Sequence, residues 1–186
     1  EISKIFDLSD INKAGAKFSW EKLNWINSQY IKNMESIKLS KILQTYWDDI
    51  GWVTPSQEWA LKLTILLKDS MTLLKDAIDQ SKPFFLLPKI QKDGLDFLEH
   101  KECKTSLKII LKYLEEKNNA KTHKYDYKEL INEISKKHNT KKGILMRSLR
   151  VAFFGCLSGP DLFQSWELLE EIGSVKSRIE RCFFSN

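Results

Sequence analysis

The sequence predicts an all-α protein. Apolar side chains recur at the three- to four-residue spacing of amphipathic helices along most of its 186 residues, and no convincing run of alternating β-branched residues indicates a strand. Residues that typically cap helix N-termini stand directly before several of these stretches, at Ser19, Thr54, Asp126 and Ser174. We therefore expect helices packed on helices, in one domain or two small ones.

Two helices are expected near the N-terminus. Ser19 would cap a helix from Trp20 to about Lys32, and a second helix would follow from about Ser40 to Ile50. The apolar side of the first helix is expected to carry Trp20, Leu23, Trp25 or Ile26, and Tyr30.

The third helix has a clear start signal, the stretch TPSQ. Thr54 is the expected N-cap, Pro55 takes the first helical position, and Gln57 completes a capping box. This helix would reach about Asp69 and carry Trp59, Leu61, Leu63 and Leu66.

Prolines separate the next segments. A helix is expected from about Met71 to Gln80, and Pro83 and Pro88 then bracket the apolar stretch FFLL. Because proline interrupts helices, we expect FFLL to be a break that plugs the junction between helical layers.

The C-terminal half continues as helices. Gly94 to Glu116 would supply one or two of them, and Asn118 to Thr122 would form a loop. Asp126 would then cap a helix from Tyr127 to His138, and Ser174 would cap the final helix.

Composition favours a soluble protein with an anionic partner. The net charge of +5 and the isoelectric point near 9.0 favour a nucleic acid over a membrane. No apolar run approaches the ~18 residues of a membrane span. Cys103, Cys156 and Cys182 are widely spaced and are expected to be reduced packing residues. His100 and Cys103 alone do not make a metal site, so we expect neither a metal nor nucleophilic catalysis.

The segment from Gly143 to Leu169 is the most informative in the chain. An amphipathic helix there places Arg147, Arg150 and Phe154 on one side, and a Gly-Pro turn and a second helix follow. Guanidinium groups pair with phosphates or base edges, and rings stack on unpaired bases, so this side suits a nucleic acid. Alternatively, the arginines are ordinary solvated charges and Phe154 belongs to the core.

Lysines are concentrated just before this segment. Seven lysines and three acidic residues lie between Lys121 and Lys142, which gives this stretch a net charge of +4. The run is either a solvated face or, together with the arginine helix, a continuous surface for phosphates.

Two separated segments carry motifs in a common order. One has the pattern Leu-Arg-x-Ala-x-x-Gly at Leu149, Arg150, Ala152 and Gly155, followed by Gly159, Pro160 and a hydrophobic helix. The other lies between Phe6 and Lys32 and has Ile11, Lys13, Gly15, Ala16, Lys22, Leu23, Trp25, Asn27, Tyr30 and Ile31. Together they resemble the C-terminal anticodon-binding region of bacterial-type glutamyl-tRNA synthetases, and in detail cyanobacterial and plastid members.

The resemblance implies two helical modules that form an anticodon-binding helical cage. Residues 1–33 would be the end of the stem-contact region, 34–92 the first module and 93–186 the second. Arg150 would face the anticodon, and the bases would pack against Gly159, Pro160, Leu162 and Phe163, although Leu162 and Phe163 are equally well explained as core residues. Contacts with the tRNA backbone are assigned to Arg147, Lys141 and Lys142.

The catalytic signatures of class I synthetases are absent from these residues. Neither a His-x-Gly-His signature nor a Lys-Met-Ser-Lys-Ser loop occurs, and the chain opens on Glu1 instead of Met. We therefore expect a piece of a larger cytoplasmic or plastid ligase, monomeric and inactive alone. The piece would need no cofactor of its own, since ATP and Mg²⁺ would be handled by the catalytic domain of the same chain.

One position departs from the family pattern. Members that accept only glutamate tRNA generally carry an arginine that reads the third anticodon base, and the resemblance places Ser70 near that position. Serine lacks the bidentate cationic fork of arginine. The parent enzyme would then be non-discriminating and also charge glutamine tRNA, with Lys68 as a weaker substitute for the arginine.

Two other functions remain open from the sequence. One is a stand-alone tRNA-binding module derived from the synthetase. The other is a helical protein-interaction domain that uses exposed tryptophans.

Overall fold

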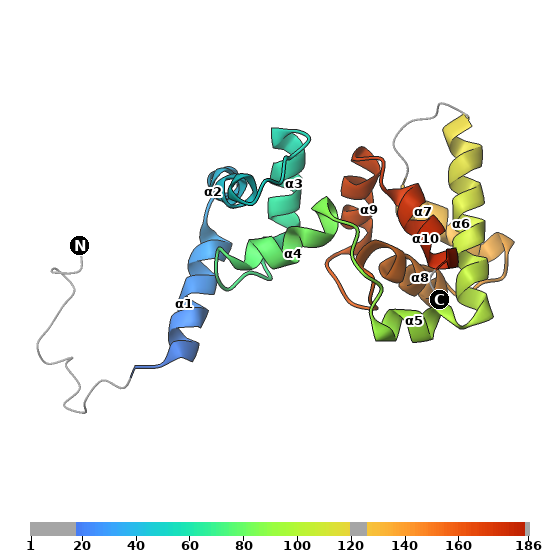
Figure 1. The fold of residues 1–186 in the computed structure, drawn as a ribbon, viewed down its shortest axis with the longest axis horizontal. Coiled ribbons are helices and arrows are strands. Elements are labelled where there is room, and N and C mark those ends of the chain that lie inside the picture. The colour runs from blue at the N-terminus through green and yellow to red at the C-terminus, as the bar shows by residue number, and fades with distance from the viewer. Residues whose placement is uncertain (1–17, 120–125, 185–186) are drawn as a thin grey trace, which may run out of the picture.

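The structure, a computed structural model, describes residues 18–119 and 126–184. Within these ranges it has ten α-helices and no strand, which confirms the predicted fold class (Figure 1). No helix in these ranges is long and apolar enough to cross a membrane. In chain order the helices are α1 (Trp20–Asn33), α2 (Ser36–Asp49), α3 (Gln57–Lys68), α4 (Asp76–Phe85), α5 (Lys92–Leu98), α6 (Lys101–Asn119), α7 (Tyr127–Lys137), α8 (Lys142–Phe154), α9 (Leu162–Glu171) and α10 (Val175–Phe184).

Local capping signals predicted several helix boundaries correctly. The Ser19 hydroxyl accepts a hydrogen bond from the backbone N–H of Lys22, so α1 starts where expected. The Asp126 carboxylate accepts from the N–H groups of Lys128 and Glu129 at the start of α7. Part of the expected loop at 118–122 and the motif residues at 11–16 lie outside the described residues.

Helix α3 begins later than predicted, and helix α2 begins earlier. The N-cap of α3 is Ser56, not Thr54, because the extended backbone at Ser56 brings its hydroxyl 3.1 Å from the N–H of Trp59. Pro55 therefore lies outside the helix. In the preceding segment, α2 begins at Ser36, one turn before the predicted Ser40.

The prediction for α4 was wrong at both ends. Residues 71–75 form a turn closed by the Asp76 carboxylate, which accepts from the N–H groups of Thr72 and Leu73 at 3.0 and 2.7 Å. The helix then continues through Pro83 to Phe85. A proline inside a helix costs about 3 kcal/mol, but continuing the helix buries Phe84 and packs Phe85 against three tryptophan rings, Trp47, Trp52 and Trp59. Burial of Phe84 and the ring contacts of the half-buried Phe85 offset the cost of the proline, so the helix is not interrupted at the start of FFLL.

The helices form two neighbouring groups, α1–α4 and α5–α10 (Figure 1). They share one apolar core, and α3 packs against α9 where the groups meet. The indole N–H of Trp59 in α3 donates to the carbonyl oxygen of Leu168 in α9 at 3.0 Å. Residues 86–91 link α4 to α5; the division of the chain into three domains stays a prediction.

The apolar side predicted for α1 is not buried by the described residues. Trp20, Trp25 and Tyr30 are 70%, 64% and 71% exposed, and of this helix only Ile31 is buried. The predicted side is therefore not the side through which α1 packs, since the buried residue, Ile31, is not one of those assigned to it.

Candidate nucleic-acid interface

A cleft of about 390 Å³ lies where the two groups of helices meet. Ser70, two residues beyond the end of α3, and the Gly159-Pro160 turn that follows α8 both line this cleft. The sequence had singled out both features from distant parts of the chain. The lining residues are Leu67, Ser70, Asp79, Gln80, Pro83, Gln91, Phe154, Cys156, Ser158, Gly159 and Pro160.

Close packing of backbone against backbone joins the two walls. Gly155 ends α8 in the left-handed conformation, with φ of +77°, and its carbonyl oxygen accepts from the N–H of Gln91 at 2.7 Å. A Cβ atom at Gly155 would lie 2.2 Å from the carbonyl oxygen of Lys89. Only glycine therefore allows the 86–91 linker to approach the end of α8 this closely.

The Gly159-Pro160 turn rests on the ring of Phe154. A Cβ atom at Gly159 would lie 2.6 Å from this ring, and Phe154 itself is only 5% exposed. Phe154 is therefore a core residue that supports the turn from below, the second of the two roles considered for it.

The Arg150 side chain binds the backbone of the same turn. One guanidinium nitrogen, Nη1, donates to the carbonyl oxygens of Gly159 and Pro160 at 3.1 and 3.0 Å. Bonds to a charged donor are stronger than bonds between neutral groups, so they fix the turn's shape. The other N–H groups of the guanidinium are not used by these two bonds, and contact with a base stays a prediction.

The first two residues of α9, the helix after the turn, differ in burial. Asp161 caps α9 by accepting from the N–H groups of Phe163 and Gln164. Leu162 is 1% exposed and belongs to the core, which is the structural role considered for it from the sequence. Phe163 is half-buried, with the ammonium group of Lys128 5.8 Å from its ring centre.

Ser70 is paired with Gln80, a residue that the sequence gave no reason to select. The Ser70 hydroxyl lies 2.6 Å from Oε1 of Gln80, and Nε2 of Gln80 donates to the Ser70 carbonyl oxygen at 3.3 Å. Lys68, the suggested substitute for a missing arginine, does not line the cleft. Its ammonium group donates instead to the carbonyl oxygen of Met34, just beyond α1, which argues against that suggestion.

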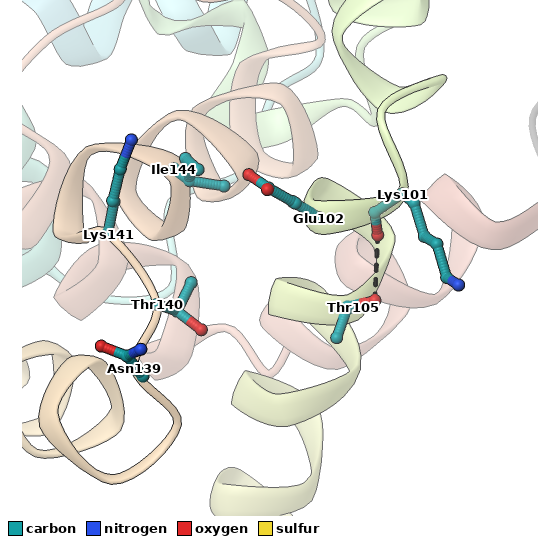
Figure 2. A pocket seen from close by; sticks show the side chains of 7 residues that line it. All are labelled: Lys101, Glu102, Thr105, Asn139, Thr140, Lys141 and Ile144. Atoms are coloured by element: carbon teal, nitrogen blue, oxygen red, sulfur yellow. Dashed lines mark hydrogen bonds between the residues drawn. The ribbon is translucent and has the colours of Figure 1, made fainter.

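The cationic residues predicted to contact the tRNA backbone lie outside the cleft. Arg147 and Lys142 are exposed on α8, and Lys141 lines a separate hollow of about 510 Å³ together with Lys101. Figure 2 shows the ammonium groups of Lys101 and Lys141 on opposite sides of this hollow, pointing away from each other. They therefore do not converge on one anion.

The cationic side chains named above thus lie outside the cleft and not among the residues that line it. No lysine or arginine is among the residues that line it, and its one charged lining residue is Asp79. An uncharged to acidic cleft suits the hydrogen-bonding edges of bases better than phosphates, whereas the lysines and arginine outside suit phosphates.

Two arginines of α10, one buried and one half-buried, donate to backbone carbonyls at the ends of helices next to the cleft. Arg178, which is 2% exposed, donates to the carbonyl oxygens of Phe153 and Pro83 at 2.7 and 2.6 Å. These carbonyls lie in the last turns of α8 and α4, where helices leave such groups unpaired. Burial, together with the nearby charge of Arg181, lowers the pKa of Arg178 to about 10. Arg181 donates to the carbonyl oxygens of Ala152 and Pro88.

The three cysteines differ in accessibility. Cys103 and Cys182 are buried, and burial raises the pKa of both thiols, that of Cys182 to about 11. Cys156 lines the cleft, is half-buried, and donates to the carbonyl oxygen of Ser158 at 3.3 Å. It is therefore a natural reporter group for occupation of the cleft.

Comparisons with known proteins identify the family of this chain. The anticodon binding domain family matches residues 29–182. A glutamate–tRNA ligase of Prochlorococcus marinus strain MIT 9215 is 75% identical over 185 residues, which is 100% of this chain and 39% of the relative. The corresponding ligase of strain MIT 9211 is 47% identical over 98% of the chain and 38% of its own length. The chain therefore spans about two fifths of these curated relatives.

Solved structures give the same result. A glutamate tRNA ligase from Elizabethkingia meningosepticum superimposes with a TM-score of 0.84 at 26% identity, over 97% of this chain and 35% of that protein. The glutamate–tRNA synthetase from Elizabethkingia anophelis superimposes with a TM-score of 0.72 at 29% identity, over 97% and 34%.

Proposed function

Since this chain belongs to the anticodon binding domain family and corresponds to the C-terminal part of glutamate–tRNA ligases, we propose that the cleft receives unpaired anticodon bases of a tRNA. The observation that carries this proposal is the separation of charge around the cleft. Unpaired bases would enter a cleft lined by polar and apolar groups, while Arg147, Lys141 and Lys142 would contact phosphates.

The turn after α8 supplies the surface on which bases would pack. Gly159 and Pro160 line the cleft and are fixed from below by Phe154 and from the side by Arg150. A rigid turn of small residues lets a base approach the backbone without displacing side chains, and preorganisation of this kind lowers the entropy lost on binding.

We propose further that the cleft discriminates weakly between glutamate and glutamine tRNAs. These tRNAs differ at the third anticodon base, and a site rejects the wrong base mainly by leaving buried polar groups unpaired. Ser70 offers a small hydroxyl in place of an arginine fork, so the penalty would be small. The chain is then expected to bind the two tRNAs within about tenfold of each other, roughly 1.4 kcal/mol.

The activity proposed for the whole protein is attachment of glutamate to tRNA with ATP. ATP and Mg²⁺ would be handled by residues outside this chain, because the class I signatures are absent from it. For the whole protein we propose a monomer located in the cytoplasm or, if organellar, in the plastid stroma.

The test is whether an anticodon stem-loop protects Cys156 from a maleimide. At saturating RNA with a glutamate anticodon, we expect Cys156 to react several-fold more slowly, measured by mass spectrometry of the intact chain and its peptides. A hairpin with the same stem and a four-nucleotide loop is the matched control, since it keeps the phosphates but lacks the anticodon. Equal binding of both RNAs without protection would contradict the proposal.

A further inference from the structure

The Ser70 and Gln80 side chains form a clamp with one consistent hydrogen-bond arrangement. The single hydroxyl proton of Ser70 has two acceptors within reach, the Leu67 carbonyl oxygen at 2.7 Å and Oε1 of Gln80 at 2.6 Å. The Leu67 carbonyl already accepts from the Ser70 backbone N–H at 3.0 Å. If the hydroxyl donates to Gln80, the Leu67 carbonyl oxygen and Oε1 of Gln80 each accept a hydrogen bond. This assignment also orients the amide so that Nε2 donates to the Ser70 carbonyl oxygen.

The clamp uses only half of the Gln80 amide. An amide has two N–H donors and two acceptor lone pairs, so one donor and one acceptor remain. Gln80 lines the cleft together with Asp79 and the Gly159-Pro160 turn. These remaining groups are the ones available to a base in the cleft.

A neutral amide fits the edges of both bases that distinguish the two tRNAs. By the genetic code, the third anticodon base is cytosine in glutamate tRNAs and guanine in glutamine tRNAs. Cytosine presents an amino donor next to a ring acceptor, and guanine presents a carbonyl acceptor next to a ring donor. One donor and one acceptor on Gln80 therefore form two hydrogen bonds with either base.

We propose that Gln80 is the residue whose side chain reads the third anticodon base, that Ser70 positions its amide, and that the dual character of the amide makes the cleft accept cytosine and guanine alike. The assignment rests on the proposed function of the cleft. It makes Gln80 the specificity-determining residue and Ser70 a positioning residue.

Two substitutions of Gln80 are expected to shift the preference in opposite directions. Gln80→Glu keeps the bond from the Ser70 hydroxyl but offers only acceptors, which match the two adjacent donors of guanine. Gln80→Lys offers only donors, which match the acceptors of cytosine. Relative to the unsubstituted chain, we expect the ratio of the two dissociation constants to change about tenfold toward guanine with Glu and about tenfold toward cytosine with Lys.

The measurement is the dissociation constant for two anticodon stem-loops that differ only at the third anticodon base. Gln91→Glu is the charge-matched control, because Gln91 lines the same cleft. It is expected to weaken both RNAs equally and leave their ratio unchanged. Ser70→Ala should reduce the effect of Gln80→Glu on the ratio, and Ser70→Thr, which keeps the hydroxyl, should restore it.

The outcomes separate this inference from the proposed function. Binding with protection of Cys156, but with the same ratio in the Glu and Lys variants, would overturn the role of Gln80 and leave the cleft as the anticodon site. A shift of equal size in Gln91→Glu would overturn it too, because charge alone would then explain the effect. Failure of the unsubstituted chain to bind either stem-loop would overturn the proposed function itself.

Discussion

Gly155→Ala tests the junction at which the two walls of the cleft meet. The added Cβ would occupy left-handed backbone, at a cost of about 1–2 kcal/mol, and would lie 2.2 Å from the Lys89 carbonyl oxygen. Relief of that contact would cost roughly 1–3 kcal/mol, as in an overpacked core. Loss of the hydrogen bond from the Gln91 N–H would add about 1 kcal/mol. After the gain from a less flexible unfolded chain, about 0.4–1 kcal/mol, we expect the free energy of unfolding to fall by about 2–6 kcal/mol.

Gly51→Ala is the matched control. Gly51 has the same φ of +77°, but no heavy atom lies within 4 Å of its ideal Cβ position. In this variant alanine must adopt left-handed backbone, but its Cβ atom meets no steric clash. Its free energy of unfolding is therefore expected to fall by about 1 kcal/mol. The difference between the two variants isolates the contact between Gly155 and the linker.

The assay is thermal unfolding followed by far-UV circular dichroism, with stem-loop affinity as the second readout. The steric contact and the hydrogen bond together make the two variants differ by about 2–4 kcal/mol. For a chain of this size, 1 kcal/mol shifts Tm by about 2–4 °C, so Gly155→Ala should melt at least about 4 °C below Gly51→Ala. It should also weaken binding of the anticodon stem-loop, because Gly155 connects the linker to the turn. Equal melting temperatures, within about 2 °C, would refute the claim that this approach needs glycine.

Three further predictions concern the site and the chain as a whole. Arg150→Ala should weaken binding of the anticodon stem-loop by about 1–3 kcal/mol, and Arg150→Lys should recover part of this loss. If binding of every RNA weakened equally and became less salt-dependent by about one charge, Arg150 would contact a phosphate instead. Ser70→Arg should increase the preference for glutamate tRNA over glutamine tRNA because it introduces the arginine fork next to Gln80. An unchanged ratio would show that a side chain at position 70 does not reach the third anticodon base, and a preference near a hundredfold in the unsubstituted chain would contradict weak discrimination. The chain should show no glutamate-dependent ATP–pyrophosphate exchange because it lacks the class I signatures, and measurable exchange would contradict that view.

The sequence by itself determined the features that depend on neighbouring residues. The all-α class follows from apolar spacing, and the starts of α1 and α7 follow from Ser19 and Asp126, whose side chains bond to backbone groups within three residues. The family was also determined, because the Leu149–Gly155 pattern and the Gly159-Pro160 turn are contiguous motifs. Such features need no knowledge of what packs against them.

Tertiary structure decided the features that depend on distant residues. Pro83 lies inside α4 because rings from α2, α3 and the segment between them pack around Phe85. The pairing of Gln80 with Ser70 and of Arg178 with two helix ends exists only once the chain has folded. The hydrogen-bond partner and the burial of a side chain are set by the elements that surround it. The local spacing of residues does not show which elements those are. The same reason explains why periodicity assigned an apolar side to α1 but did not reveal that this side is exposed among the described residues and that the helix buries Ile31 instead.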